Sequence, residues 1–590
     1  MQRTNAWYSI PFTYFKRTYL TFHTPRSAIN MPEKLPLNLV IVGGVAGGMS
    51  AATRARRLDE TASVTVFERG PYVSYANCGI PYALDGVIEK ADSLLLQTPQ
   101  AFKARFNVDV HTNTEVVSID REKHEVEVRT TGVEETRRVP YDKLILSQGA
   151  ETFRPPIDGI NLPSVFGLQT IPDLKKIKAY ISEHRASYAA VIGGGFIGLE
   201  AAENLRYLGL ETSILEYAPH VFPPIDQDIA ERLHAEIQRH DVRLILNARI
   251  QKIEAGNISL DGGERVPADV VLVATGVRAR TSLARQAGLQ IGKSGVTVNT
   301  FMQTSDPAIY AVGDMVAPAH RVAGRPFPLA LAGPASRQGR LAADHIFGKA
   351  AASAAYRGNV GTAVCKIFDL TVACTGLGVT TLQEMGRDPL WVTVHPPDHA
   401  TYYPGAHPMT LKVVFERETG RLLGAQAVGV ASIDKRIDVL STALQAGMKI
   451  FDLEHLELAY APPYGSAKDP VNMAGFVGSN VLRDMVKIIH PNELMSTLAL
   501  KQEQIVDVRS PEEFARGHVR TAVNLPIDRL REKLGSLDRR RRVVVYCAVG
   551  YRGYLAYRIL AQHGFADVVN LDGGYKSVVD GGYKALVQDY

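Results

Sequence analysis

Two cysteines stand in sequence settings that suit thiol chemistry, and the first is Cys78. It lies in the segment SYANCGIPY, residues 74–82, between an asparagine and a glycine. A dithiol redox motif would place a second cysteine close by, but the residue five positions further on is Ala83. Exchange between a thiolate and a disulfide needs a second sulfur. We therefore expect the exchange partner of Cys78 to come from outside this segment.

The second cysteine, Cys547, lies in RRVVVYCAVGYRG, residues 541–553. The pattern predicts a buried strand that delivers Cys547 onto a six-residue turn, followed by a helix over YLAYRILAQHGF. In such a turn successive backbone N–H groups point inward and form an anion-binding nest, to which Arg552 adds positive charge. We expect this nest to stabilise a thiolate or a persulfide on Cys547.

The other candidate ligands carry weaker signals. Cys365 and Cys374 alternate with apolar residues in TAVCKIFDLTVACTG, as core thiols of strands do. His395, His399 and His407 have poor spacing for a metal site, so we expect no metal. Four scattered cysteines in 590 residues do not make a disulfide scaffold. They fit a reducing compartment, which predicts a cytoplasmic location.

A glycine-rich turn follows a predicted strand in YAAVIGGGFIGLEAAENLRYLG. Gly193, Gly195 and Gly198 fit the pattern G-x-G-x-x-G between strand and helix, which lets backbone N–H groups approach a pyrophosphate. Glu216 at the tip of the next strand suits a free ribose 2′-hydroxyl and would repel a 2′-phosphate. The segment predicts an NADH site, with NADPH possible.

The same plan occurs earlier, in LNLVIVGGVAGGMSAATRARRL, and indicates an internal duplication. Gly43 and Gly48 take the outer glycine positions, whereas Val45 stands where the second glycine belongs. Glu68 has the expected acidic position, and Asp314 in YAVGD could hold a sugar-like chain, so we expect FAD here. The candidate cofactor-binding residues are Gly43, Gly44, Ala46, Gly48, Glu68, Arg69, Asn77, Gly149, Gly193, Gly195, Gly198, Glu216, Gly276, Gly313 and Asp314.

The elements that must position these residues predict an α/β protein of several domains. A chain of 590 residues is too long for one core and suggests about three to five domains. We expect two Rossmann-like nucleotide-binding domains, then an α+β domain, then a smaller α/β domain. The predicted boundaries are a leader over 1–35, an FAD-binding domain over 36–152 and 277–350, an NAD(P)H-binding domain over 153–276, a separate α+β domain over 351–480, a linker over 481–495 and a final α/β domain over 496–590.

Composition excludes several classes of function. The formal net charge is +5, but residues 1–30 hold four basic residues and no acid, so the rest gives no electrostatic case for nucleic acid. No apolar run approaches the roughly 20 residues that span a bilayer, so we expect no membrane association. The leader lacks the apolar core of a secretory signal, and we interpret it as a loose extension or a misassigned start.

Residues 36–480 resemble the pyridine nucleotide–disulfide oxidoreductases. Within them the similarity is to the single-cysteine coenzyme A-disulfide reductases and NADH-dependent persulfide reductases, on the motifs GGVAGG, SYANCGIPY, YYPG and YAPPYGSAKDP. The resemblance implies that Cys78 faces the flavin and forms a mixed disulfide with coenzyme A. The residues that it places around coenzyme A are Ser50, Arg54, Arg57, Ser74, Asn77 and Lys468.

The resemblance also implies a homodimer, with residues 351–480 as its dimerisation domain. Tyr402 and Tyr460 match two family tyrosines that meet the thiol from the partner subunit, where a phenol can donate a proton to the departing thiolate. If that geometry holds, each active site is shared between two copies.

Residues 496–590 are similar to rhodanese domains. The loop around Cys547 fits C-x-x-G-x-R, and IVDVRSPEEFARGHVRTAVNLP and NLDGGY are further family segments. The resemblance implies that Cys547 carries sulfane sulfur with Arg552 in the catalytic loop. We expect Asp507 and Arg509 to be framework residues, and the run Arg539–Arg542 to be a solvated charge cluster.

Together these features predict NADH- and FAD-dependent reduction of sulfur–sulfur bonds. The favoured substrates are coenzyme A persulfide or inorganic polysulfide, with coenzyme A disulfide as the alternative. Two other classes stay open: an NADH oxidase or peroxidase that cycles through a sulfenic acid on Cys78, and a redox sensor that binds a protein partner through the rhodanese domain.

Overall fold

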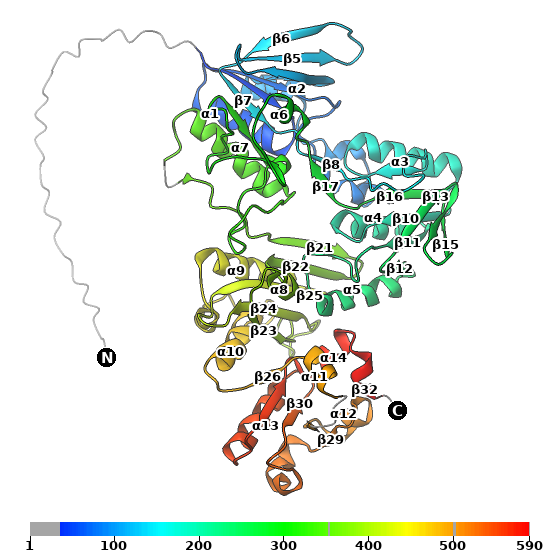
Figure 1. Cartoon of the computed structure of the whole chain (residues 1–590), viewed down its shortest axis with the longest axis vertical. Coiled ribbons are helices and arrows are strands. Elements are labelled where there is room, and N and C mark those ends of the chain that lie inside the picture. Colours follow the sequence, from blue (N-terminus) through cyan, green and yellow to red (C-terminus); the bar gives the residue numbers. More distant parts are fainter. Residues whose placement is uncertain (1–35, 352–353, 499–502, 589–590) are drawn as a thin grey trace, which may run out of the picture.

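The computed structural model describes residues 36–351, 354–498 and 503–588, and the predicted leader lies outside these residues. Four structural units follow one another along the long axis of the molecule (Figure 1). The two nucleotide-binding units lie at one end, an antiparallel sheet lies in the middle, and the C-terminal unit lies at the far end. Within this part of the chain no helix combines the length and the apolar character needed to span a bilayer.

The first unit is built on a five-stranded parallel sheet with helices packed against it. Its central strand β1 (Asn38–Val42) is apolar and fully buried from Leu39 to Ile41, as expected for a parallel sheet covered on both faces. Helix α1 (Ala46–Leu58) packs against α7 (Ala332–Ile346). In spatial order the strands are β20 (Ile309–Ala311), β7 (Lys143–Leu146), β1 (Asn38–Val42), β2 (Ser63–Phe67) and β3 (Asp109–His111).

The second unit repeats this plan. Helices α3 (Ile171–His184), α4 (Phe196–Tyr207) and α5 (Gln227–Arg239) accompany its parallel sheet. The strands in spatial order are β12 (Arg243–Ile245), β11 (Glu211–Leu215), β10 (Tyr188–Ile192), β16 (Val270–Val273) and β9 (Val165–Gly167). The chain crosses between the two units on β8 (Ala150–Thr152) and β17 (Val277–Ala279), which pair antiparallel.

Each nucleotide-binding unit also carries a small antiparallel sheet. The strands are β4 (Thr114–Asp120), β5 (Glu125–Thr130) and β6 (Thr136–Pro140) in the first unit, and β13 (Ile250–Glu254), β14 (Gly256–Leu260) and β15 (Arg265–Ala268) in the second. The short helices α2 (Pro99–Phe106) and α6 (Ser282–Gln286) complete the first unit.

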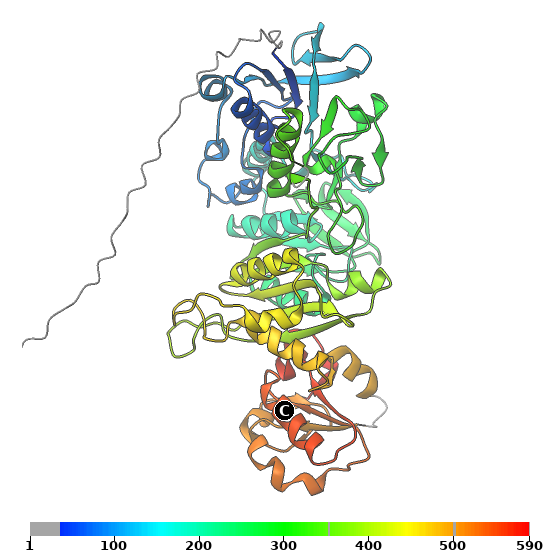
Figure 2. The same ribbon diagram turned by 90° about the vertical axis from the view of Figure 1, so that its left-hand side faces the viewer.

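The third unit is a five-stranded antiparallel sheet covered by α9 (Ile433–Ala446) and α10 (Pro470–Leu482). Two of its loops, 395–409 and 456–469, project from the body of the molecule (Figure 2). The strands in spatial order are β21 (Ala363–Ile367), β22 (Leu370–Gly376), β25 (Leu422–Gly429), β24 (Thr410–Glu416) and β23 (Pro389–Val394). Helix α8 (Val379–Glu384) follows β22.

The fourth unit is a parallel sheet flanked by α11 (Pro491–Leu498), α12 (Pro511–Ala515), α13 (Tyr551–Gln562) and α14 (Gly574–Asp580). Its strands in spatial order are β26 (Ile488–Ile489), β31 (Val568–Leu571), β30 (Val543–Tyr546), β27 (Gln504–Asp507) and β29 (Val523–Asn524). The mixed α/β fold class expected from the sequence is confirmed.

The predicted linker over 481–495 needs a correction. Strand β26 lies inside it and pairs with β31, with Ile488 opposite Asn570 and Ile489 opposite Leu571. Helix α11 begins within it as well. Residues from β26 onward therefore belong to the C-terminal unit, because β26 is an edge strand of its sheet. The sequence pattern did not reveal this, since a two-residue strand has no pattern of its own and takes its register from a partner about 80 residues away.

Candidate active sites

The two glycine turns have the same geometry. Gly43 and Gly193 adopt φ angles of 105° and 107°, which favour glycine. Gly48 and Gly198 allow each helix to pack on its turn, because a Cβ there would lie 1.9 and 2.0 Å from the carbonyl oxygen of Gly43 or Gly193. The duplication read from the sequence is thus present in the backbone.

An acidic residue closes each turn. Glu68 Oε2 accepts a hydrogen bond from the Gly44 amide at 2.8 Å. Glu216 Oε2 accepts one from the Gly194 amide, and its Oε1 accepts a second from the Ala218 amide at 2.7 Å. Both carboxylates are therefore oriented before any nucleotide binds, and each keeps lone pairs free for a ribose hydroxyl.

The turns fit nucleotide pyrophosphates. The N-cap residues of helices α1 and α4, Val45 and Gly195, provide no side-chain cap, and neither helix has an acid in its first turn, so the first N–H groups are free for an anion. A Cβ on Gly195 would meet no atom within 4 Å, which leaves the backbone open to a ligand. Burial raises the pKa of the Asp314 carboxyl beside Gly313, as expected for an acid at the edge of a closed site.

Cys78 lies in a single 3₁₀ turn, η1 (Asn77–Gly79), that is tied to the first glycine turn. The link is Ser74, whose amide donates to the carbonyl oxygen of Gly44 at 2.8 Å and whose φ is 46°. Cys78 is exposed, and its Sγ lies 3.8 Å from Asn77 Oδ1. The backbone thus places this thiol beside the first nucleotide site.

The chain's own groups oppose ionisation of Cys78. Partial burial raises the pKa of the thiol, and the nearby carboxyl groups of Glu200 and Asp314 raise it further. A short turn such as η1 has no helix dipole to offset these effects. Cys78 itself lies in this 3₁₀ turn and not at the start of an α-helix.

Glu200 is a site residue that the sequence analysis missed. It lies on α4, and Tyr82 from the Cys78 segment donates its hydroxyl to Glu200 Oε1 at 2.9 Å. Burial raises the pKa of Glu200 to about 7, although the Tyr82 hydrogen bond acts in the opposite direction. Glu200 therefore changes its protonation state near neutral pH, within electrostatic range of Cys78. The signal was hidden because Glu200 lies two residues after the glycine motif, within the helix that follows it, and has the appearance of an ordinary helix residue.

The residues expected around coenzyme A are dispersed. Ser50, Arg54 and Arg57 follow one face of α1, and Arg57 is exposed. Arg54 is already paired, because its Nε lies 2.5 Å from Asp344 Oδ1 of α7. Lys468 is exposed on the loop before α10. The described structure leaves Arg57 and Lys468 accessible to a phosphate, while Arg54 would have to share its charge with Asp344.

Tyr402 and Tyr460 come together on the two projecting loops. Their hydroxyl oxygens are 2.9 Å apart, and the hydrogen bond raises the pKa of Tyr402. Both side chains are exposed, with Tyr402 at 74% and Tyr460 at 49% of full accessibility. The two predicted tyrosines therefore form a hydrogen-bonded pair within one chain, and the surface on which they lie is accessible to a second molecule.

The loop around Cys547 has the expected nest geometry. Strand β30 delivers a buried Cys547, and the Gly550 amide donates to its Sγ at 3.2 Å. Helix α13 starts directly after Gly550, whose φ is 100°. The amide that faces the sulfur is thus that of the N-cap residue of α13, where the helix dipole is positive.

Arg552 does not act alone in this loop. Its guanidinium makes two hydrogen bonds of 2.7 Å to the carboxylate of Glu513, which the sequence analysis missed. Glu513 first, and the Cys547 thiol to a smaller extent, raise the pKa of Arg552. Arg552 in turn lowers the pKa of Glu513 to about 2. The pair fixes the guanidinium beside the sulfur but partly neutralises its charge.

The framework residues lie where the sequence placed them. Asp507 and Arg509 form a buried ion pair, with Arg509 Nη2 at 2.7 Å from Asp507 Oδ2 and also donating to the carbonyl oxygen of Gly517. Cys365 and Cys374 are buried core thiols as expected.

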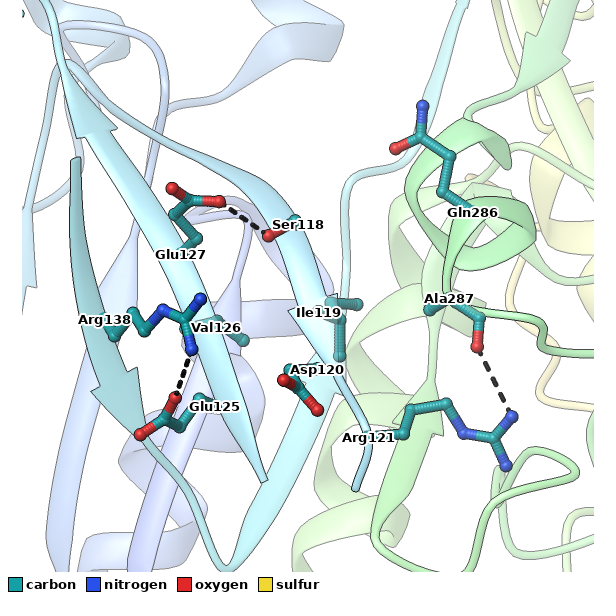
Figure 3. Close-up of a pocket in the computed structure, with 10 residues that line it drawn as sticks. All are labelled: Ser118, Ile119, Asp120, Arg121, Glu125, Val126, Glu127, Arg138, Gln286 and Ala287. Carbon is teal, nitrogen blue, oxygen red and sulfur yellow. Dashed lines mark hydrogen bonds and ion pairs between the residues drawn. The ribbon is translucent and has the colours of Figure 1, made fainter. Parts of the chain in front are cut away.

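Two polar features of the described residues lie apart from these sites. Glu236, His240 and Asp369 come within reach of a single metal ion, but Arg239 already bonds both carboxylates. A surface hollow of about 340 Å³ lies between the small sheet β4–β6 and α6, and it contains none of the candidate residues. Figure 3 shows Arg138 bonded to Glu125 and Arg121 bonded to Ala287 there, so its charges are largely satisfied.

Comparison with known proteins agrees with this architecture. Residues 37–339 match the family model described as pyridine nucleotide-disulphide oxidoreductase, and residues 362–469 match the dimerisation domain of that family. Residues 490–581 match the rhodanese-like domain.

Similar proteins extend the match. The crystal structure of reduced Bacillus anthracis CoADR-RHD is 40% identical, covers 94% of this chain and 99% of its own, and superimposes with a TM-score of 0.91. A NAD-dependent persulfide reductase from A. fulgidus is 38% identical, covers 91% and 99%, and has a TM-score of 0.85. The coenzyme A disulfide reductase of Staphylococcus epidermidis is 33% identical over 74% of this chain and 99% of its own length. The chain belongs to the pyridine nucleotide-disulphide oxidoreductases, a family of FAD- and NAD(P)H-dependent enzymes, and carries a rhodanese-like domain after its dimerisation domain.

Proposed function

We propose that the protein reduces coenzyme A persulfide or polysulfide at the expense of NADH, and that Cys547 carries the sulfane sulfur. The observation that carries the proposal is the presence, in one chain, of two different thiols: Cys78 is exposed, and Cys547 is buried in a turn whose Gly550 amide donates to its Sγ. All four cysteines of the chain are free, so neither thiol has a disulfide partner within it.

In the proposed reaction the Cys78 thiolate attacks the inner sulfur of coenzyme A persulfide. The sulfur–sulfur bond of the persulfide breaks, HS⁻ leaves, and Cys78 is joined to coenzyme A in a mixed disulfide. FAD, when bound, supplies the two electrons of NADH that split a disulfide of this kind. With one proton taken up, the products are the Cys78 thiolate and coenzyme A thiol, so the sum is NADH, H⁺ and persulfide to NAD⁺, coenzyme A thiol and H₂S.

The chain's own residues assist at three points. Glu216 favours NADH by its charge, and Arg57 and Lys468 are free to meet phosphates of coenzyme A. Glu200 and Asp314 destabilise the Cys78 thiolate, so formation of the uncharged mixed disulfide relieves this repulsion. The rhodanese-like loop supplies sulfur as a Cys547 persulfide held by backbone N–H groups.

A homodimer follows from the same proposal. The Tyr402–Tyr460 pair is exposed on projecting loops of the dimerisation domain and makes its hydrogen bond within the pair. In a dimer each pair would reach the Cys78 site of the other copy, where a phenol can protonate the departing coenzyme A thiolate.

The test compares NADH-dependent turnover on coenzyme A persulfide, inorganic polysulfide and coenzyme A disulfide. It uses the FAD-loaded wild type, Cys547→Ser, and Cys374→Ser as a buried-thiol control. We expect kcat/KM to be highest for the persulfide, and Cys547→Ser to lower turnover of polysulfide while Cys374→Ser does not. A clear preference for the disulfide that Cys547→Ser leaves unchanged would make the protein a coenzyme A-disulfide reductase instead. Oxygen or peroxide consumption without coenzyme A would favour the oxidase alternative.

A further inference from the structure

The rhodanese-like domain is docked on the dimerisation sheet through buried hydrogen bonds. The backbone amide of Thr393 donates to both carboxylate oxygens of Asp572, at 3.1 and 3.0 Å. His395, which follows β23, lies with its Nε2 2.8 Å from Ser577 Oγ of α14. Thr393, His395 and Asp572 are all buried. Since α14 lies at the junction of the two domains (Figure 1), these contacts set its position relative to the reductase.

His395 is held firmly on both sides of its ring. Its Nδ1 lies 3.1 Å from Thr410 Oγ1 on β24. Burial lowers the pKa of His395 to about 3, and the charges of Lys576 and Arg232 lower it further, so the imidazole is neutral across the working pH range. The neutral ring is hydrogen-bonded at both nitrogens and so connects β24 with α14, and this connection does not change with pH.

The space between His395 and α14 has no room for another side chain. Gly573, just before α14, has a φ of +64°. A Cβ at this position would lie 1.9 Å from Ser577 Oγ and 2.9 Å from His395 Nε2. Glycine is needed here because of the positive φ and the closeness of Ser577, and His395 of the other domain is the next nearest group.

The other side of the same segment shapes the Cys547 loop. The amides of Tyr575 and Lys576 donate to the carbonyl oxygens of Cys547 and Ala548, at 2.8 and 2.9 Å. Gly574 packs so closely that a Cβ would lie 2.4 Å from the Cys547 carbonyl oxygen. These two bonds fix the orientation of the peptides that carry the Ala548 and Val549 N–H groups. The next amide of the same turn, that of Gly550, donates to Sγ of Cys547.

We propose that His395 of the dimerisation domain is a positioning residue for the sulfur-carrying loop, acting through Ser577 and α14 on the orientation of the Cys547 and Ala548 peptides. The inference rests on the proposed role of Cys547 as a sulfur carrier. It assigns the reductase body a part in the chemistry of the rhodanese-like domain: the loop has its full anion-binding geometry only while the two domains are docked.

The experiment uses the full-length, FAD-loaded protein with four variants: His395→Ala, His395→Gln, Ser577→Ala and the double alanine variant. His407→Ala is the matched control, because His407 is exposed on the same projecting loop. Sulfur transfer is followed with thiosulfate as donor and cyanide as acceptor: the Cys547 thiolate takes one sulfur and releases sulfite, and cyanide then removes that sulfur as thiocyanate. The second readout is the rate of Cys547 alkylation by iodoacetamide as a function of pH, measured by peptide mass spectrometry.

We expect His395→Ala and Ser577→Ala each to lower kcat for sulfur transfer by about three- to tenfold, the effect of losing one buried hydrogen bond. The double variant should lose no more than either single one, since both remove the same contact. The alkylation profile of His395→Ala should move to higher pH because the N–H groups no longer align on the thiolate. His395→Gln, whose amide can still reach Ser577, should recover most of the activity, and NADH-driven turnover of coenzyme A disulfide should not change.

Two results would overturn the inference: wild-type sulfur transfer and alkylation in His395→Ala, or alkylation that becomes faster at every pH without a shift of the profile. The second would show a loop that is merely more accessible. If wild-type Cys547 accepted no sulfur, the proposed function would fail at that step, and the alkylation profiles would still decide the role of His395.

Discussion

Charge on Glu200 should control the reactivity of Cys78 near neutral pH. Burial raises the pKa of Glu200 to about 7, and the hydroxyl of Tyr82 at 2.9 Å counteracts this by stabilising the carboxylate. The carboxylate in turn raises the pKa of Cys78. Above pH 7 Glu200 is ionised and opposes the thiolate, whereas below it the neutral acid does not. Replacing either Glu200 or Tyr82 therefore changes how Cys78 titrates.

The size of the effect follows from the hydrogen bond. A hydrogen bond to a charged group contributes about 1.5–3 kcal/mol, and about 1.4 kcal/mol corresponds to one pKa unit. Tyr82→Phe should thus raise the pKa of Glu200 by about one to two units and keep it neutral to higher pH. In that variant Cys78 should react faster than in the wild type between about pH 7 and 8. Glu200→Gln, neutral at every pH, should react faster across the whole range above about pH 7.

The assay is alkylation of the FAD-loaded protein by iodoacetamide from pH 5.5 to 9.5, with the Cys78 peptide quantified separately from the Cys547 peptide. Tyr72→Phe is the control, since it removes a hydroxyl that bonds Lys175 rather than Glu200. Superimposable profiles for the wild type, Tyr82→Phe and Glu200→Gln would refute the reasoning.

Three further predictions test other parts of the structure. Glu513→Gln should lower the rate of sulfur transfer by Cys547 about tenfold, because it releases the guanidinium of Arg552. The pKa of Glu513 in the folded protein is about 2, below its ordinary value, so its ionised form stabilises the fold above about pH 4.5 and this effect is lost only as the pH falls toward 2. An inflection from Glu513 between pH 5 and 9 in the rate profile of the wild type would contradict the pairing with Arg552. Buried Lys412 lies with its Nζ 2.9 Å from Oδ2 of buried Asp226 and pairs also with the half-buried Asp228. Lys412→Met should lower the free energy of unfolding by about 3–5 kcal/mol because the Asp226 carboxylate then stays buried without its cation, and adding Asp226→Asn should restore part of this loss in chemical denaturation. A loss below about 1 kcal/mol would contradict a buried ion pair. Glu216→Ala should raise the ratio of kcat/KM for NADPH to that for NADH about tenfold, because it removes the negative charge that repels the 2′-phosphate of NADPH. An unchanged ratio would show that Glu216 does not select the cofactor.

Local motifs account for what could be predicted from the sequence. The turns at Gly43 and Gly193 and the nest at Cys547 are each encoded within about ten residues, so their geometry could be inferred from spacing. The buried strands that lead into them are continuous apolar runs, which identify parallel sheets without any knowledge of the partners.

Contacts between distant segments account for what was missed. Glu200 meets Tyr82 across 118 positions, Arg552 meets Glu513 across 39, and Arg54 meets Asp344 across 290. In the sequence each of these charged residues is indistinguishable from an ordinary surface residue, because its partner is brought to it only by the fold. Strand β26 was read as linker for the same reason, since its hydrogen bonds come from β31.

The central claim is that the lone thiol at Cys78 takes its exchange partner from coenzyme A, while Cys547 holds sulfane sulfur. Mass spectrometry of the purified protein, kept free of reductant, tests it most directly. We expect the Cys78 peptide to carry a coenzyme A adduct that dithiothreitol removes, and the Cys547 peptide to carry one additional sulfur after exposure to polysulfide. A Cys78 peptide that stays unmodified when the protein is incubated with coenzyme A disulfide or persulfide would contradict the account.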